Sequence, residues 1–336
     1  MRIPTSVVLR AAAVAAGVWL AAATCANIAA ATLEWKPDKP IEIIAQSAAG
    51  GGTDLTARLI QRILQERQLV EPPVSVINKP GGGGNIGLAY LSQRTPDGHS
   101  LEVATALLLT NHILGSSNFH YTDFTLLALL NSEYVAFAVR AESPIKTVKD
   151  ILAALKKDPS SLSIAVGTSL GGANHMSAAL VTRAAGGDAK KLKLIVFKSS
   201  AESATALLGG HVDMVVSSAS LLAPHFTSGA VRILAMTAPR RSEGLFAPVP
   251  TWKELGYDIV VDNFRALIGP SGMAPAQIAF WDDTLARLMK SDDWKTNAER
   301  MMWDSNYRDS RETRKYFDAQ YEASRRVLSD LGMARK

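Results

Sequence analysis

The chain has 336 residues, with 36 lysines and arginines against 31 aspartates and glutamates, which gives a formal net charge of +5. It contains one cysteine, no run of basic residues and no basic patch interleaved with aromatic residues. This composition excludes a disulfide framework and argues against nucleic-acid binding, whereas small anionic partners remain compatible with the mild positive charge.

The N-terminus has the pattern of a secretory signal peptide over residues 1–31: two arginines, an uncharged run from Ala11 to Ala23, and small residues ending at Ala31. The uncharged run is too short and too rich in alanine to span a membrane. Cleavage near Ala31 removes Cys25 and both arginines, which leaves a balance of 34 minus 31, or +3. Lipid attachment at Cys25 is an alternative, but Thr24 is bulky for the preceding position. About 300 mature residues suffice for two domains.

The rest of the chain alternates short apolar segments with amphipathic helical segments, which is the order of a parallel sheet with crossover helices. We expect strands at 41–45, 74–77, 101–104, 125–130, 134–139, 163–166, 194–197, 212–216, 231–236 and 264–268. We expect helices at 55–64, 85–94, 148–157, 174–185, 202–208 and 221–228, and two more near 278–289 and 317–331. The two β segments between 124 and 140 are expected near a crossing between domains.

The loop from Ser47 to Asp54 contains three successive glycines between an expected strand and an amphipathic helix. Glycines leave the backbone unobstructed, so its N–H groups can turn toward an anion, and Thr53 or Asp54 can cap the helix. Comparable loops follow strands at 78–87, 167–175 and 197–201. In open α/β sheets ligands lie at the carboxyl ends of the strands, so these loops predict a carboxylate site without an acid–base pair. A tight turn without a ligand is the alternative.

Two motifs suggest other functions. Residues 167–171 match the G-x-S-x-G pattern of a serine hydrolase with Ser169 as nucleophile, but the later histidines follow too closely to complete that fold. Residues 82–87 match G-x-G-x-x-G, with Glu102 where a ribose-binding acid is expected, but a glycine run satisfies this pattern by composition. No metal-ligand spacing or phosphate-binding Gly-Lys-Ser/Thr is present, and no cofactor is expected. His175, at a helix start, is either a hydrogen-bonded structural residue or a ligand contact.

The chain resembles the periplasmic substrate-binding proteins of tripartite tricarboxylate transporters, often called Bug proteins, from about residue 39 to 331. The segments that carry the resemblance are AGGGTDLTAR at 49–58, NKPGGGGNIG at 78–87, PDG at 96–98, LLGGHVD at 207–213 and VPT at 249–251. The resemblance implies an α/β fold of two lobes, each a mostly parallel sheet flanked by helices, that close over one ligand in the cleft. We expect lobe I to contain 32–139 and 250–336, and lobe II to contain 140–249.

The same resemblance implies a monomeric, non-enzymatic periplasmic protein that delivers an organic carboxylate to membrane permease subunits. It implies that the first glycine loop and the loop after the strand at 163–166 hold the carboxylate through backbone amides and water. The predicted ligand-binding residues are Ser47, Ala48, Ala49, Gly50, Gly51, Gly52, Thr53, Asp54, Thr105, Thr168, Ser169, Gly171, Gly172, His175, Lys198, Ser199, Ser218 and Arg265. A secreted serine hydrolase remains the alternative, and a sensory role through a membrane kinase is compatible with ligand binding.

The sequence departs from the family pattern at two places that bear on the ligand. Residues 197–202 read FKSSAE where many members have Tyr-Lys-Gly and a proline, and 264–266 read FRA where an aromatic pair followed by glycine is common. Arg265 either forms an interlobe salt bridge or binds a second carboxylate in bidentate fashion. We therefore expect a dicarboxylate or an aromatic carboxylate.

Overall fold

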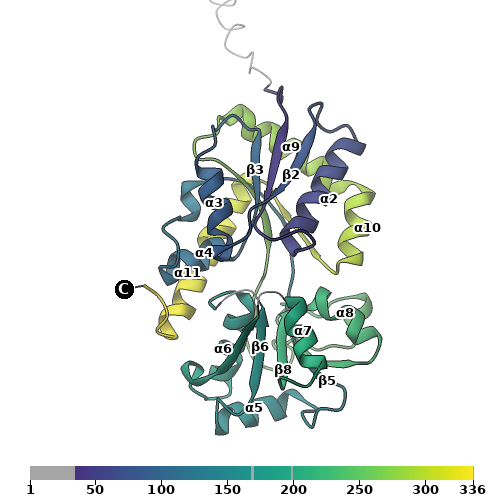
Figure 1. Ribbon diagram of the computed structural model, residues 1–336, viewed down its shortest axis with the longest axis vertical. Helices are drawn as coiled ribbons and strands as arrows, with labels where there is room; N and C mark the ends of the chain where they lie inside the picture. The colour runs from purple at the N-terminus through teal and green to yellow at the C-terminus, as the bar shows by residue number, and fades with distance from the viewer. Residues whose placement is uncertain (1–34, 168–169, 198–199, 336) are drawn as a thin grey trace, which may run out of the picture. The chain divides into compact units, whose positions relative to one another are not determined.

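The computed structural model describes residues 35–167, 170–197 and 200–335. The predicted signal peptide lies outside the described residues, and so do Thr168, Ser169, Lys198 and Ser199. From Pro37 onward the chain forms one compact unit that contains two β-sheets, each with helices packed on it (Figure 1). This confirms the predicted α/β class.

Six strands form the first sheet: β1 (Ile41–Ala45), β2 (Val74–Asn78), β3 (Ser100–Thr105), β4 (Thr125–Ser132), β10 (Arg265–Gly269) and β11 (Asp304–Arg308). Their spatial order is β11-β4-β10-β3-β1-β2. β1 pairs in parallel with β2 and β3, whereas β10 and β11 pair antiparallel with their neighbours. The carboxyl ends of β1, β2 and β3 therefore meet at one edge of the sheet.

Five strands form the second sheet: β5 (Val135–Arg140), β6 (Ser163–Gly167), β7 (Lys193–Phe197), β8 (Met214–Ser218) and β9 (Val231–Met236). Their order is β7-β6-β8-β5-β9, so β7 is an edge strand. β6 pairs in parallel with β7 and β8, and β5 pairs antiparallel with β8 and β9. The carboxyl ends of β6, β7 and β8 again share one edge.

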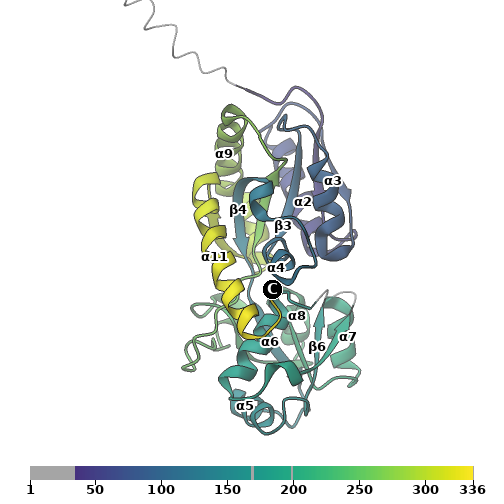
Figure 2. The same ribbon diagram turned by 90° about the vertical axis from the view of Figure 1, so that its left-hand side faces the viewer.

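The helices associated with the first sheet are α2 (Gly52–Glu66), α3 (Asn85–Ser92), α4 (Leu107–Leu114), α9 (Pro275–Lys290), α10 (Asp292–Arg300) and α11 (Ser310–Asp330). Those associated with the second sheet are α5 (Val148–Lys157), α6 (Ala173–Ala184), α7 (Ser200–Leu208) and α8 (Ala219–Thr227) (Figures 1 and 2). Short 3-10 turns lie at Gly82–Gly84, Tyr121–Asp123, Ala189–Lys191 and Gly244–Phe246. Within the described residues, no helix combines the length and apolar character that crossing a bilayer requires.

Helix α2 shows how far the apolar pattern determines packing. Its predicted face is buried at Leu59, Ile60, Ile63 and Leu64, because residues three and four apart lie on one side of a helix. Leu55 shares this apolar spacing but is 40% exposed, because it lies in the first turn, at the rim of the sheet edge. The pattern therefore holds along the helix and fails at its N-terminus.

Three elements were not predicted. Helix α4 is only eight residues long and carries its three polar residues in succession, from Thr110 to His112, so it shows no amphipathic period. β11 has the polar sequence DSNYR and is an edge strand, so it lacks the alternation of a half-buried strand. Helix α10, DDWKTNAER, buries only Trp294 and Ala298. In each case tertiary contacts, rather than local periodicity, determine the structure.

The chain passes between the sheets twice. β4 ends at Ser132 in the first sheet and β5 begins at Val135 in the second, so Glu133 lies in the first crossing. On the return, Trp252 still packs against Phe137 of the second sheet, with ring centroids 5.1 Å apart. The core of the second sheet also includes Ile259 and Val261, and β10 then begins in the first sheet.

These crossings shift both predicted lobe boundaries, which were set at 139/140 and 249/250. The pairing of β5 moves the first boundary before Val135, and the packing of Trp252 and Val261 moves the second beyond Val261. The sequence could not place them, because β4 and β5 are equally apolar and the sequence does not show which sheet each one joins. Leu328 and Leu331, at the end of the chain, also pack in the second core.

Candidate functional site

The first glycine loop, residues 46–51, connects β1 to α2 and is held by its own side chains. Ser47 Oγ accepts hydrogen bonds from Thr53 Oγ1 at 2.8 Å and from the N–H of Asp54 at 3.3 Å. The side-chain amide of Asn78, at the end of β2, donates to the carbonyl of Ser47 at 2.9 Å. Thr53 and Asp54 are buried. These side chains therefore serve the loop rather than an open surface.

Asp54 fixes the conformation of the same loop. Its carboxylate accepts hydrogen bonds from the N–H of Gly50 at 2.8 Å, from Asn78 Nδ2 at 2.8 Å and from Arg58 Nε at 3.0 Å. Burial alone would raise the pKa of Asp54, but the bonds from Arg58, Asn78 and Gly50 outweigh burial and lower the pKa below its ordinary 3.8. Asp54 was predicted as a ligand contact and a possible cap. Its carboxylate is instead occupied within the loop, and the N-cap is Gly51, which has no side chain.

The loop leaves several backbone donors without an acceptor. In the part of the chain that the structure describes, the N–H groups of Ala48, Ala49, Gly52 and Thr53 have no hydrogen-bond partner. Ala48, Ala49 and Gly52 are exposed. Two of these amides belong to the first turn of a 15-residue helix, whose dipole places partial positive charge there. The loop can therefore bind an anion through its backbone.

Arg265, at the start of β10, borders this loop. A Cβ at Gly52 would lie 2.8 Å from Arg265 Nη2, so the close approach of the guanidinium requires glycine. Arg265 Nη2 donates to Glu133 Oε2 at 3.1 Å, and Nη1 donates to the carbonyls of Asn263 and Phe264. Both charged side chains are less than one-tenth exposed. Arg265 thus forms the salt bridge that was one of its two interpretations, and both Nη atoms donate hydrogen bonds, whereas its buried Nε has no partner among the described residues.

Glu133 links this arginine to the second sheet. It lies in the first crossing and also accepts a hydrogen bond from the hydroxyl of Ser220, in the first turn of α8. Its backbone carbonyl accepts from the N–H of Asn263, in the second crossing, at 2.9 Å. One buried carboxylate therefore connects both crossings with one helix of each sheet, since Arg265 in turn lies against α2.

Two further predicted residues lie at the same sheet edges. Thr105 ends β3, pairs in register with Arg265, and accepts a hydrogen bond from the N–H of Leu107 at 3.3 Å. Ser218 ends β8 and is the N-cap residue of α8. Both side chains are buried, with 8% and 6% exposed. Both residues therefore lie at the carboxyl ends of strands, at the sheet edges that carry the candidate loops.

The second loop follows β6, and its described part is organised by His175. The N–H of Gly171 donates to His175 Nδ1 at 2.9 Å. Burial lowers the pKa of His175, so its imidazole is neutral at pH 7 and carries its proton on Nε2. His175 therefore has the structural role that was one of its two interpretations, because it fixes the turn at Gly171.

The N-terminus of α6 presents a second group of free amides. Its N-cap is Gly172, without a side-chain cap, and the N–H groups of Gly172, Ala173 and Asn174 have no acceptor among the described residues. At Gly171, where φ is +82°, an added Cβ would clash with Leu114 at the end of α4. The loop after β6 therefore touches a helix of the first sheet, so the two edges that carry the free amides face each other.

The second glycine run is not built as a dinucleotide site. Glu102 is fully buried in β3, lies against Gly87, and accepts a hydrogen bond from Gln46 Nε2 at 2.7 Å. Burial raises its pKa to about 8, so it is a neutral acid at pH 7. An acid in this position cannot hold a ribose, and the G-x-G-x-x-G match is structural.

The hydrolase interpretation gains no support from the described histidines. Ser169 lies outside the described residues. His175 Nδ1 is bound to Gly171. His211 lies in the turn before β8 and His225 in the last turn of α8, both at the far ends of elements whose other ends form the candidate site. Across the described residues, no cluster of His, Cys, Asp and Glu is arranged to hold a metal ion.

Three residues that surround Arg265 were not predicted from the sequence: Glu133, Ser220 and Asn263. The sequence did contain a sign that Glu133 is important, since it is the single charged residue between two apolar strands. A lone acid in such a place needs a buried partner. Asn263 directly precedes the predicted strand at 264–268. Only the crossing of the chain, which the sequence does not show, places these residues beside each other.

The two sheets with opposed carboxyl edges define the class of two-lobed binding proteins, and sequence comparison identifies the family. The family described as tripartite tricarboxylate transporter family receptor matches residues 56–333, and the chain belongs to this family. A Cupriavidus necator protein, the UPF0065 protein in the gbd 5' region, is 28% identical over 300 residues, which cover 89% of each chain. Protein BugT of Bordetella pertussis is 26% identical and covers 82% of this chain and 83% of its own.

Solved structures agree with this family and fold. A TctC solute-binding protein from Polaromonas is 27% identical, with a TM-score of 0.71 over 88% of this chain and 99% of that chain. An R. palustris protein solved with adipate is 22% identical, with a TM-score of 0.79 over 89% of this chain and 99% of that chain. The family is one of periplasmic receptors for solutes, and the expectation drawn from the sequence motifs is confirmed.

We expect Glu102→Gln to change how stability depends on pH. Glu102 has a folded pKa of about 8 against an ordinary 4.5, so the folded state holds a proton that the unfolded state releases. Its contribution is complete below about pH 4.5 and is lost as pH rises toward 8, at up to about 1.4 kcal/mol per pH unit. Glutamine has no such proton. Urea unfolding from pH 5 to 8 should show the variant gaining stability relative to the wild type, and parallel curves would contradict the assignment.

We expect Arg265→Ala to lower the free energy of unfolding by about 3–5 kcal/mol, because it leaves Glu133 buried without its charged partner. The double variant Arg265→Met with Glu133→Gln removes both charges and should recover most of this loss, since the glutamine still bonds Ser220. Urea unfolding of the three proteins tests this coupling. A single variant within about 0.5 kcal/mol of the wild type, the range of uncoupled surface changes, would show that the pair does not form.

Proposed function

We propose that this protein is a periplasmic receptor that binds one organic carboxylate between its two sheets and delivers it to a tripartite transporter in the membrane. One observation carries the proposal: helices α2 and α6 present unoccupied amides from facing sheet edges. Each group alone would suit any small anion. Two groups facing each other can enclose the same carboxylate, and enclosing it draws the two sheets together.

The proposed contacts are backbone atoms rather than charged side chains. On the first sheet they are the amides of Ala48, Ala49, Gly52 and Thr53, and on the second they are those of Gly172 and Ala173. Ser47, Asp54 and His175 support the site indirectly, because their side chains accept hydrogen bonds from loop N–H groups and hold the loops in place. Thr168 and Ser169, between β6 and α6 in the sequence, and Lys198 and Ser199, between β7 and α7, remain proposed contacts on the basis of the sequence.

The ligand class is an organic carboxylate, with dicarboxylates and aromatic carboxylates as the two candidates. The R. palustris structural neighbour was solved with adipate, which supports a dicarboxylate. Binding of a second carboxylate was one of two interpretations of Arg265, whose Nη atoms donate to Glu133 and to two carbonyls. We propose that Arg265 adds positive potential beside α2 and that a second carboxylate is held elsewhere in the loops, where Lys198 is the natural candidate.

The proposed export rests on the N-terminal sequence, and the proposed membrane partner rests on the family. We propose that residues 1–31 are removed as a signal peptide and that the mature protein acts as a monomer in the periplasm. The family is named for its role in tripartite transporters, so the membrane permease subunits are the proposed partner. The bound carboxylate is released unchanged, because the proposed contacts supply binding without an acid, base or nucleophile.

A thermal-shift screen tests the proposed function. The mature protein, unfolded and refolded to remove carried-over ligand, is heated with adipate, hexanoate, benzoate and terephthalate, and with adipamide as a neutral control. A ligand at about one hundred times its Kd stabilises the fold by about 2.7 kcal/mol, which raises the melting temperature by about 5 °C. We expect such a rise with at least one acid and none with adipamide. No rise with any acid would contradict the proposal.

A matched pair of glycine variants locates the binding. Gly52→Ala places a Cβ against Arg265 beside the proposed amides, and Gly209→Ala places one 2.9 Å from the exposed ring of His211, after α7. Gly209→Ala meets an exposed ring that can move aside, so it controls for the gain of a methyl group, and unfolding of both variants in the absence of ligand measures the separate cost of displacing the buried Arg265. We expect Gly52→Ala to weaken binding of the acid found in the screen about tenfold, because the clash of the new Cβ with Arg265 shifts the first turn and misaligns about one amide contact, which is worth roughly 1.4 kcal/mol. Equal affinity in both variants would exclude the first loop from the site.

A further inference from the structure

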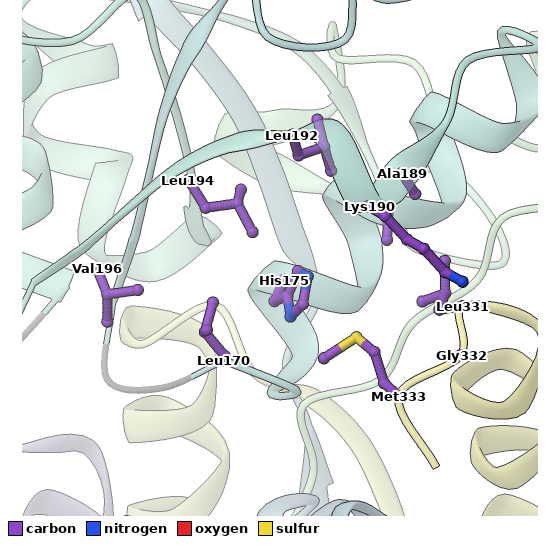
Figure 3. A pocket seen from close by; sticks show the side chains of 11 residues that line it. Leu170, His175, Ala189, Lys190, Leu192, Leu194, Val196, Leu331, Gly332 and Met333 are labelled. Atoms are coloured by element: carbon purple, nitrogen blue, oxygen red, sulfur yellow. The ribbon is translucent and has the colours of Figure 1, made fainter.

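A separate pocket of about 460 Å³ lies on the second sheet beside its edge strand β7. It is bordered by the N-terminal half of α6, by the face of β7 and by the chain that follows α11 (Figure 3). Its residues are Leu170, His175, Ala179, Ala189, Lys190, Leu192, Leu194, Val196, Leu331, Gly332 and Met333. A volume of this size is typical of small-molecule sites.

The wall of the pocket is apolar and in part open to solvent. Leu194 and Val196 are two residues apart on one face of β7, about 7 Å from each other at 3.3 Å per residue, and Leu192, directly before the strand, extends the apolar wall. Val196 and Leu170 are 45% and 50% exposed, and they are among the most exposed large apolar side chains of the described chain. Figure 3 shows Met333 reaching into the same space from the C-terminal segment. Covering this surface would release water from apolar groups.

The polar groups of the pocket favour an anion. Lys190 is its one charged lining residue, and within the described residues its amine has no acidic partner. The nearby Asp330 is paired with Arg183 at 3.2 Å, so its charge is compensated. His175 also lines the pocket and offers the Nε2–H of a neutral imidazole. The lining residues include no aspartate or glutamate, so no negative charge among them would repel a carboxylate.

We propose that this pocket is a second ligand site, which binds an amphipathic monoanion: an aliphatic monocarboxylate whose chain lies along β7 and whose carboxylate lies near Lys190. The site goes beyond the proposed receptor function, because it uses side chains and apolar area where the first site uses backbone amides. It shares only the loop at Leu170 and His175 with the proposed receptor site.

Isothermal titration of the refolded mature protein with hexanoate, octanoate and decanoate tests the second site. Each added methylene that enters the pocket should raise affinity by up to about fourfold. Decyltrimethylammonium, with the same chain and the opposite charge, should bind at least tenfold more weakly than decanoate. These titrations contain no other ligand, so failure of the receptor function would not affect them. No binding of decanoate, or affinity independent of chain length, would overturn the proposal.

Two matched pairs of variants place the ligand in the pocket. Lys190→Gln should weaken decanoate about three- to fivefold, whereas Lys191→Gln, on the same 3-10 turn but outside the pocket, should not. Val196→Ser should weaken it about fourfold, whereas Val260→Ser, which is similarly exposed at 42% but lies elsewhere, should not. Equal effects within either pair would overturn the assignment of the pocket.

Competition separates the second site from the first. Decanoate affinity should be unchanged, within about twofold, when the protein is saturated with the short acid found in the thermal-shift screen. If decanoate and that acid displace each other competitively, decanoate occupies the first site and the proposal of a second site is wrong. Gly52→Ala, which targets the first site, should leave decanoate binding intact and provides an independent check.

Discussion

The backbone N–H groups at the first turns of α2 and α6 are the feature on which the proposed site depends, and the surrounding side chains keep those groups free. Ser47 and Asp54 bind donors within the first loop, and His175 binds the N–H of Gly171 in the second. The N-cap positions are glycines without side chains. A serine or aspartate at either cap would satisfy the amides internally. The amides are therefore available to a ligand because neither helix has a side-chain N-cap.

The buried pair of Arg265 and Glu133 sets the geometry in which those amides face each other. It lies where the chain crosses between sheets, and its hydrogen bonds reach α8 through Ser220 and the second crossing through Asn263. Removing both charges can be tolerated in a core, whereas removing one is costly. The pair therefore resists rearrangement at the crossings, and Arg265 contributes positive potential at α2.

The sequence predicted the parts of this account that depend on local patterns. The glycine loop after β1, the apolar face of α2 and the alternation of strands and helices all follow from spacing within about ten residues. Glu133 and β11 were missed, because their partners lie more than a hundred residues away in the chain. The lobe boundaries were set differently, because they depend on which sheet β5 joins. The role of Arg265 stayed open for the same reason. Its two interpretations differ only in which carboxylate lies opposite the guanidinium, that of an acidic residue or that of the ligand. The spacing of residues in the sequence does not show which one it is.

The most direct test of the central claim is to follow backbone amide resonances while a bound carboxylate is titrated into isotope-labelled protein. The account predicts that the amides of Gly52 and Thr53 on the first sheet, and of Gly172 and Ala173 on the second, shift together with one dissociation constant. The amide of Gly209, after α7, should not move. Shifts confined to one of the two loops, or absent from both, would contradict a single site enclosed by the two helix N-termini.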